Sequence, residues 1–305
     1  MGMRLVICLV IAAVVLSGGG IASAAPRYSD WSNTKYFSEV NTPDFEFANG
    51  VSKDGLTFYF QRGNQFLNTE DIWIVQRPAE DAAWGIPMKL PDTVNSTAFN
   101  ERAAFESPDG HWLFFASSRP GGKGDFDLYV SWRQHTHDAS GWETPVRLDA
   151  LNTVGFDSGP TVFEDEATGL LQMYFVSNPV GPQNASVDIY RSAQQFDSSW
   201  ATPQKVDQLN STAPEGRPYV RHDGLEIFFS SARPGLGGGD IWFATRASTE
   251  EDWSTPQLAP GINTVFGDNV PALSWDGQTL YFSSNRSGSQ GEIYFATREK
   301  VTGRP

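Results

Sequence analysis

The sequence predicts an all-β fold, a five-bladed β-propeller with four strands in each blade. A unit marked by tryptophan recurs five times, at intervals of 53, 58, 58 and 53 residues. Each unit contains four short segments with strand-like patterning, and repeats of this size and strand number are typical of propeller blades. One tryptophan segment also precedes the first complete unit, as a ring closed by its own N-terminal strand requires. The five tryptophans are Trp31, Trp84, Trp142, Trp200 and Trp253.

The segments follow the same order in every unit. An acidic residue precedes an apolar stretch, which is the predicted first strand. A turn such as "SPDG" leads to an aromatic run such as "WLFFASSR", which suits a buried second strand. A Gly-rich connection leads to a third run such as "DLYVSWR", whose alternation is that of a half-exposed strand. The tryptophan then begins the fourth segment, which ends ten or eleven residues later in Val/Leu/Ile-Asn-Ser/Thr.

The fifth unit lacks a tryptophan segment of its own, because the chain continues only as "TREKVTGRP" after its third strand. Residues 31–41 supply the missing fourth strand and remove the two open sheet edges of an unclosed array. We therefore predict a single propeller domain over residues 29–300, followed by a tail of residues 301–305. The repeated tryptophans are expected to pack between blades, each burying roughly 150–250 Å².

Residues 1–24 have the pattern of a secretory signal peptide. A basic start is followed by a short apolar run, three glycines and Ala22-Ser23-Ala24, with cleavage expected after Ala24. The apolar run is too short to span a bilayer. The sole cysteine, Cys8, lies in this leader, so the mature chain is expected to be cysteine-free. The predicted location is therefore secreted or periplasmic.

Charge excludes some partners. Without the leader the chain has 21 basic and 36 acidic side chains, a net charge of −15. Such a surface repels nucleic acid and anionic lipid. We expect a monomer with no essential cofactor. Its partner is expected to be an envelope or secreted protein, or a carbohydrate or other small-molecule ligand.

The segment "SPDGHWLFFASSRPGGKGDFDLYVSWR" (residues 107–133) and its copies resemble the TolB-type, WD-like propeller repeats of bacterial envelope proteins. The resemblance covers nearly all of the mature chain. It implies a periplasmic or secreted protein that binds partners or ligands with its funnel. We expect no extra anchoring or enzymatic domain beside the repeats, so the role of TolB itself is not expected to transfer whole.

Strand direction places the acid of each unit on one face, around the mouth of the central channel. A ring of carboxylates repels itself and needs cations, which arginines at equivalent positions after the second strand can supply. The simplest interpretation of a feature repeated in all five units is structural. The candidate ligand-binding residues are Glu46, Glu101, Asp157, Glu215, Asp268, Arg119, Arg217, Arg233 and Arg286.

Unit three departs from the repeat. "YFVSNPVG" has Asn178 and Pro179 where other units have Ser and Arg, so Asp157 loses its expected cation. We hypothesise that Asp157 has a raised pKa and faces a ligand site shared with Arg217 and Glu215.

A binding protein is favoured over an enzyme, and a structural envelope adaptor that uses its rim loops is a further possibility. The alternative is a secreted carbohydrate-active hydrolase with Asp157 and Glu215 as the best catalytic candidates, since glycoside hydrolysis needs two carboxylates about 5–10 Å apart. No nucleophile elbow or phosphate-binding loop occurs. His111, His135 and His137 could converge, but a loop His-x-His is usually solvated, so no metal site is predicted.

Overall fold

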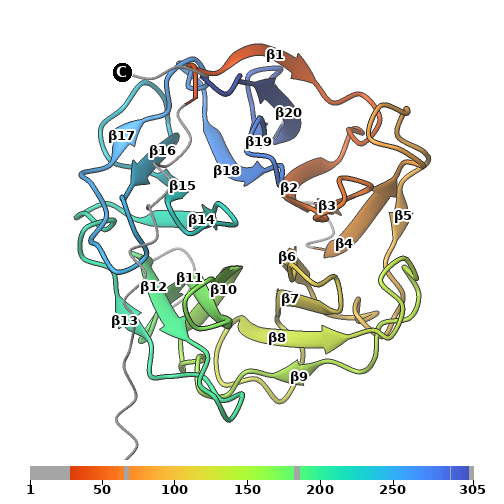
Figure 1. Cartoon of the computed structure of the whole chain (residues 1–305). Helices are drawn as coiled ribbons and strands as arrows, with labels where there is room; N and C mark the ends of the chain where they lie inside the picture. The colour runs from red at the N-terminus through yellow and green to blue at the C-terminus, as the bar shows by residue number, and fades with distance from the viewer. Residues whose placement is uncertain (1–27, 65–68, 182–185, 289, 302–305) are drawn as a thin grey trace, which may run out of the picture.

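The computed structural model describes residues 28–64, 69–181, 186–288 and 290–301. They form five four-stranded antiparallel sheets arranged as a ring (Figure 1). The predicted five-bladed β-propeller is thereby confirmed. The described residues contain no helix, and hence none long and apolar enough to cross a membrane. The predicted signal peptide and residues 302–305 of the predicted tail lie outside the described residues.

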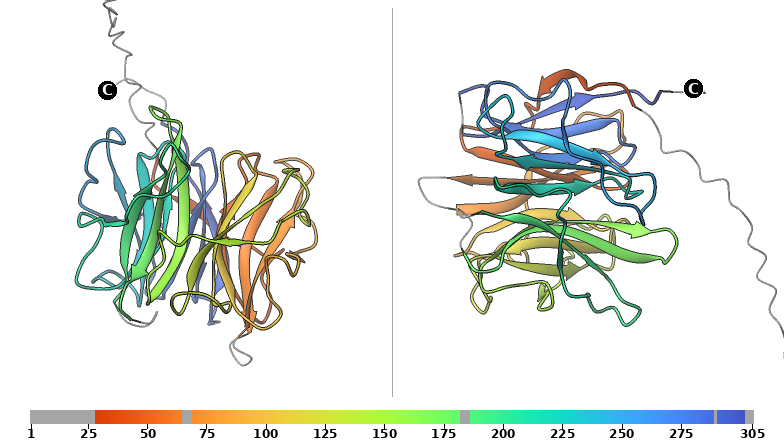
Figure 2. Two further views of the ribbon diagram at one scale, coloured as in Figure 1. Left: turned by 90° about the horizontal axis from the view of Figure 1, so that it is seen from below. Right: turned by 90° about the vertical axis from the view of Figure 1, so that its left-hand side faces the viewer.

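The strands of a blade follow one another outward from the axis and run between the two faces of the ring (Figure 2). The first three blades are β2 (Phe45–Val51), β3 (Thr57–Asn64), β4 (Thr69–Gln76), β5 (Met88–Lys89); β6 (Glu101–Glu106), β7 (Trp112–Ser117), β8 (Asp127–Trp132), β9 (Val146–Arg147); and β10 (Phe156–Asp165), β11 (Leu170–Asn178), β12 (Asp188–Ala193), β13 (Gln204–Lys205). The last two are β14 (Glu215–Val220), β15 (Glu226–Ser231), β16 (Asp240–Thr245), β17 (Gln257–Leu258); and β18 (Asp268–Leu273), β19 (Thr279–Ser284), β20 (Glu292–Thr297), β1 (Ser32–Tyr36).

The N-terminal strand closes the ring as predicted. β1 pairs with β20, with Lys35 opposite Phe295 and Tyr36 opposite Tyr294, and lies at the outer edge of blade 5 (Figure 1). The pairing continues beyond the strand, because Phe37 N–H donates to the carbonyl of Ile293 at 3.0 Å. The first and last strands of the domain are therefore held in one sheet.

The fourth strands are shorter than the tryptophan segments suggest. β5, β9, β13 and β17 each have two residues and begin four residues after the tryptophan. The tryptophan side chain instead packs against the preceding blade: the Trp31 and Phe228 rings lie 5.9 Å apart, and those of Trp253 and Tyr174 lie 6.0 Å apart. Packing between blades, rather than strand pairing, explains why this residue repeats.

The repeated asparagine at the end of each tryptophan segment acts as a side-chain substitute for strand pairing. Asn152 Oδ1 accepts from Leu128 N–H at 2.6 Å, and its Nδ2 donates to the Leu128 carbonyl at 2.9 Å. The other four asparagines make the same pair of bonds to the third strands of their blades. This pair of hydrogen bonds holds the connecting loop against the blade.

An arginine at the end of the third strand covers the tryptophan in four of the blades. In blade 2 the Arg133 guanidinium lies 4.3 Å from the Trp142 ring centre, and its Nε donates to the Gly110 carbonyl at 2.9 Å. The same two contacts recur in the pairs Arg77 with Trp84, Arg246 with Trp253, and Arg298 with Trp31. Blade 3 has Gln194 at this position, next to Trp200.

Candidate functional site

The five repeated acids lie at the start of the innermost strands, on the face of the ring that we call the acid face. All five are buried, with 0–1 % of each residue exposed. Each accepts hydrogen bonds from its own blade. In blade 2, for example, Glu101 accepts from Ser96 Oγ at 2.8 Å and from Ser117 Oγ at 2.6 Å. The structure thus places Glu46, Glu101, Asp157, Glu215 and Asp268 inside the blades, where they brace the loops of the acid face.

The arginines after the second strands pair with these acids as expected. Arg119, Arg233 and Arg286 lie 3.2, 2.8 and 2.5 Å from Glu101, Glu215 and Asp268. Each also donates to the serine that ends the second strand and to a loop carbonyl of the fourth segment. In blade 1, Arg62 makes the equivalent contacts. It occupies the position of the serine in the other blades and donates to the Glu46 carboxylate and to the Val40 carbonyl.

Asp157 differs from the other ring acids, as the sequence of blade 3 predicts. Its carboxylate accepts from Thr153 N–H and Oγ1 at 2.6 and 2.8 Å and from Ser177 Oγ at 2.6 Å. It forms no ion pair with any residue that the structure describes. Burial raises the pKa of Asp157, and the same cause raises the pKa of Glu101 and raises that of Glu46 to about 7.

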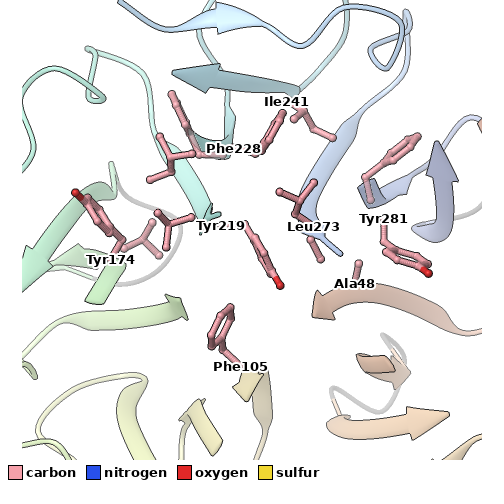
Figure 3. Packing of buried hydrophobic residues seen from close by; sticks show 14 of the residues in the cluster. Ala48, Phe105, Tyr174, Tyr219, Phe228, Ile241, Leu273 and Tyr281 are labelled. Carbon is pink, nitrogen blue, oxygen red and sulfur yellow. The ribbon is translucent and has the colours of Figure 1, made fainter. Parts of the chain in front are cut away.

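Two aromatic side chains meet across the axis of the central channel. Tyr219 from β14 and Phe105 from β6 face each other across the axis (Figure 3), with ring centres 5.4 Å apart. Both are 8 % exposed. Burial raises the pKa of the Tyr219 hydroxyl, so it stays neutral. We call this pair the aromatic plug.

Above the plug, on the acid face, lies a cavity of about 360 Å³, which we call the channel-mouth cavity. The five ring acids do not line it. The charged residues that line it are Arg102, one position after the ring acid Glu101, Arg217, two positions after Glu215, and Glu70 near the start of β4. The residues used below are Phe47, Gln61, Glu70, Arg102, Arg217 and Asn269.

Arg217 reaches across the ring from blade 4 to blade 1. Its Nη1 donates to Asn49 Oδ1 at 3.0 Å and its Nη2 to Gln61 Oε1 at 2.5 Å. The backbone makes this possible, because Arg217 sits at a bulge of β14 with a φ of 35°. Ala103, Gly159 and Val270 adopt the same left-handed conformation in their blades, so the bulge belongs to the repeat.

A chain of polar contacts joins the two arginines of the cavity. Gln61 Nε2 donates to Glu70 at 2.9 Å, and Arg102 Nε lies 2.7 Å from the same carboxylate. Arg102 also stacks on Phe126, with its guanidinium 3.8 Å from the ring centre. Arg217 has amide partners only and forms no ion pair with the described residues. Removal from water, with the nearby charge of Arg102, lowers its pKa.

Of the predicted site residues, only Arg217 lines this cavity. It does not contact Asp157 or Glu215 in the hydrogen bonds above. Sequence reasoning did not include Gln61, Glu70, Arg102 and Asn269 among the candidate site residues. The signal that could have found two of them is variation within the repeat: the residue after the acid is Phe47, Arg102, Ser158, Gly216 or Asn269.

Among the described residues, no group of three His, Cys, Asp or Glu side chains lies close enough together to bind a metal ion. His111 Nδ1 lies 2.9 Å from the Arg133 carbonyl, and His137 lies 3.7 Å from Asp54.

Known proteins resemble this chain in structure and not in sequence. No protein-family model and no curated protein sequence matches the chain. Among solved structures it is similar to a glycoside hydrolase (11 % identity, 92 % of this chain and 94 % of that chain covered, TM-score 0.61). It is also similar to the endo-arabinase from Bacteroides thetaiotaomicron VPI-5482 (18 %, 89 % and 98 %, 0.55) and to TolB from Acinetobacter baumannii (13 %, 84 % and 55 %, 0.45).

The glycoside hydrolase and the endo-arabinase, with TM-scores above 0.5, share the fold of this chain. TolB proteins also stand among the similar structures. The chain is a five-bladed β-propeller protein with a polar, arginine-lined cavity at one mouth of its central channel.

Proposed function

We propose that this protein binds an acidic carbohydrate in the channel-mouth cavity. The observation that carries the proposal is the charge of the cavity. Two arginines, Arg102 and Arg217, line it together with one carboxylate, Glu70. This excess of positive charge stands out in a chain whose net charge is −14. A partly buried guanidinium without a carboxylate partner is stabilised by an anionic ligand. The ligand therefore carries a carboxylate or a similar anionic group.

The rest of the cavity suits a sugar. Asn269 offers an amide group for hydroxyl recognition, and Phe47 offers an aromatic wall. Pockets that bind small polar ligands combine such apolar walls with a few placed polar groups. A volume of about 360 Å³ lies within the usual range for small-ligand sites. Export of the chain, which its leader-like residues 1–24 suggest, would bring it into contact with envelope or extracellular glycans.

Arg217→Gln is expected to weaken binding of uronate oligosaccharides about 10- to 100-fold, because it removes a charge-assisted hydrogen bond worth about 1.5–3 kcal/mol. Isothermal titration calorimetry with oligogalacturonate or oligoglucuronate measures the loss. Neutral oligosaccharides of equal length are expected to bind wild type more weakly than the acidic ones. Affinity should fall with added salt.

Arg191→Gln is the matched control, because Arg191 is exposed and does not line the cavity. It should bind as wild type does. Equal affinity of wild type and Arg217→Gln for every acidic glycan, with both proteins folded by thermal melting, would refute this assignment.

A second candidate function is hydrolysis of a glycosidic bond in the bound carbohydrate. Two carboxylates act on Arg102: Glu70 pairs with it directly, and the exposed Asp125 contributes through its charge. Glycoside hydrolysis uses carboxylates that reach the substrate, and Glu70 lines the cavity whereas Asp157 and Glu215 are buried inside the blades. The likeness in fold to a glycoside hydrolase favours testing this chemistry.

If the protein is a hydrolase, Glu70→Gln is expected to lower the rate on a polysaccharide or aryl-glycoside panel about 10²- to 10⁴-fold, as loss of an acid–base group does. Released reducing ends give the readout. Asp157→Asn, at a buried carboxylate, serves as the comparison. Binding without any released sugar in wild type leaves the binding function standing and excludes hydrolysis of that panel.

A further inference from the structure

A cavity between blades 2 and 3 differs from its counterparts elsewhere in the ring. It has a volume of about 430 Å³ and lies on the side of the Asp-Gly turns, opposite the acid face. Equivalent cavities lie between blades 4 and 5 and between blades 5 and 1. Those two contain the arginine that covers the tryptophan, Arg298 and Arg77 respectively. The cavity between blades 2 and 3 has Gln194 at that position.

The backbone shows that Gln194 occupies the arginine position. Its N–H donates to the Leu171 carbonyl at 2.8 Å, as Arg298 N–H donates to Gln278 at 2.9 Å and Arg77 N–H to Leu56 at 2.9 Å. The Gln194 side-chain oxygen accepts a bond from Leu171 N–H at 3.4 Å. Among the described residues, no arginine or lysine lies over the Trp200 ring as one does over the other four repeated tryptophans, and Trp200 lines the cavity.

A second substitution removes charge from the same cavity. In the cavity between blades 4 and 5, Glu226 at the start of β15 accepts two bonds from Arg298 at 2.8 and 2.6 Å. The start of β7 has Trp112 instead, 39 % exposed. Two tryptophans therefore line this cavity, and no lysine or arginine does among the described residues.

Carboxylates supply a negative rim. Glu164 and Asp109 line the cavity and are exposed, and Glu164 forms no ion pair with the described residues. Aromatic faces with acidic groups nearby attract cations, and a planar guanidinium stacks on tryptophan better than an ammonium does. Phe196, between Gln194 and Ser198 in the chain, is 90 % exposed.

We propose that the cavity between blades 2 and 3 binds an arginine side chain presented by a partner protein. The partner's guanidinium lies on Trp200, where an intramolecular arginine lies in the other four blades, with Trp112 as the second wall. Glu164 pairs with its charge. The site is independent of the channel-mouth cavity and of the function proposed for it.

The test uses the peptide acetyl-Gly-Arg-Gly-amide and its citrulline analogue, which has the same shape without the charge. Titration is followed by the indole N–H signal of Trp200 in ¹⁵N NMR, assigned with Trp200→Phe. The arginine peptide is expected to shift this signal and to bind at least 10-fold more tightly than the citrulline peptide. Free arginine, titrated in parallel, separates recognition of a peptide-borne side chain from recognition of the amino acid.

Gln194→Arg is expected to fill the cavity from within and to weaken peptide binding at least 10-fold. Gln195→Arg, at the exposed neighbouring position, should leave the affinity within about twofold of wild type. Glu164→Gln, which does not alter the buried wall, should weaken binding several-fold and serves if Gln194→Arg does not fold. Equal binding of the two peptides, unchanged binding to folded Gln194→Arg, or no response of Trp200 at millimolar peptide would each overturn the proposal.

Discussion

Deletion of residues 29–42 is expected to abolish cooperative folding of the propeller. The deletion removes β1, the outer strand of blade 5, together with Trp31, Phe37 and Val40, which are 5, 1 and 0 % exposed. Loss of each buried side chain costs about 2–5 kcal/mol, so the sum of about 6–15 kcal/mol is comparable to the 5–15 kcal/mol by which most domains are stable. β20 would also become an open edge strand.

Differential scanning calorimetry and size-exclusion chromatography measure the effect of this deletion. A chain that begins at Tyr28 is the control and should melt as the full domain does. A synthetic peptide of residues 29–42, added in trans, is expected to restore part of the transition by pairing with β20. A truncated chain as compact and heat-resistant as the control would show that closure by β1 contributes nothing.

Trp142→Ala is expected to lower the free energy of unfolding by about 3–5 kcal/mol, the usual cost of deleting a large buried aromatic side chain. Trp142 is 3 % exposed, and its ring carries the guanidinium of Arg133, which in turn pairs with Glu106. The substitution therefore leaves a cavity and also removes support from a buried ion pair.

Equilibrium unfolding in urea measures this difference. Trp112→Ala, in the same blade but 39 % exposed, is the matched control and should cost much less. A Trp142→Ala protein within about 1 kcal/mol of wild type would contradict the packing role given to the repeated tryptophans.

Repetition made the fold predictable from the sequence. The tryptophan and acid of each unit appear five times, so their spacing defines the blades and the lone Trp31 segment reveals the closing strand. Residues with the same local role in several blades, such as Arg119 and Glu101, could be paired from the sequence alone, because both partners lie within one unit.

The candidate site could not be predicted in the same way, because it is formed by residues that do not repeat. Arg217 contacts Gln61, 156 positions earlier in the chain, and only the curvature of the ring brings blades 4 and 1 together. The ring acids suggested a ligand site because they surround the channel, yet burial inside the blades depends on packing that spacing does not reveal. Gln194 also departs from the repeat in the sequence. Its part in forming a cavity depends on Trp112 of the neighbouring blade, which the sequence does not place beside it.

The aromatic plug has a consequence for how any ligand is handled. The rings of Tyr219 and Phe105 meet across the axis and narrow the path between the two faces of the ring. A polymer that threaded through the ring would have to displace this pair. A ligand of the channel-mouth cavity is therefore expected to enter and leave at the acid face.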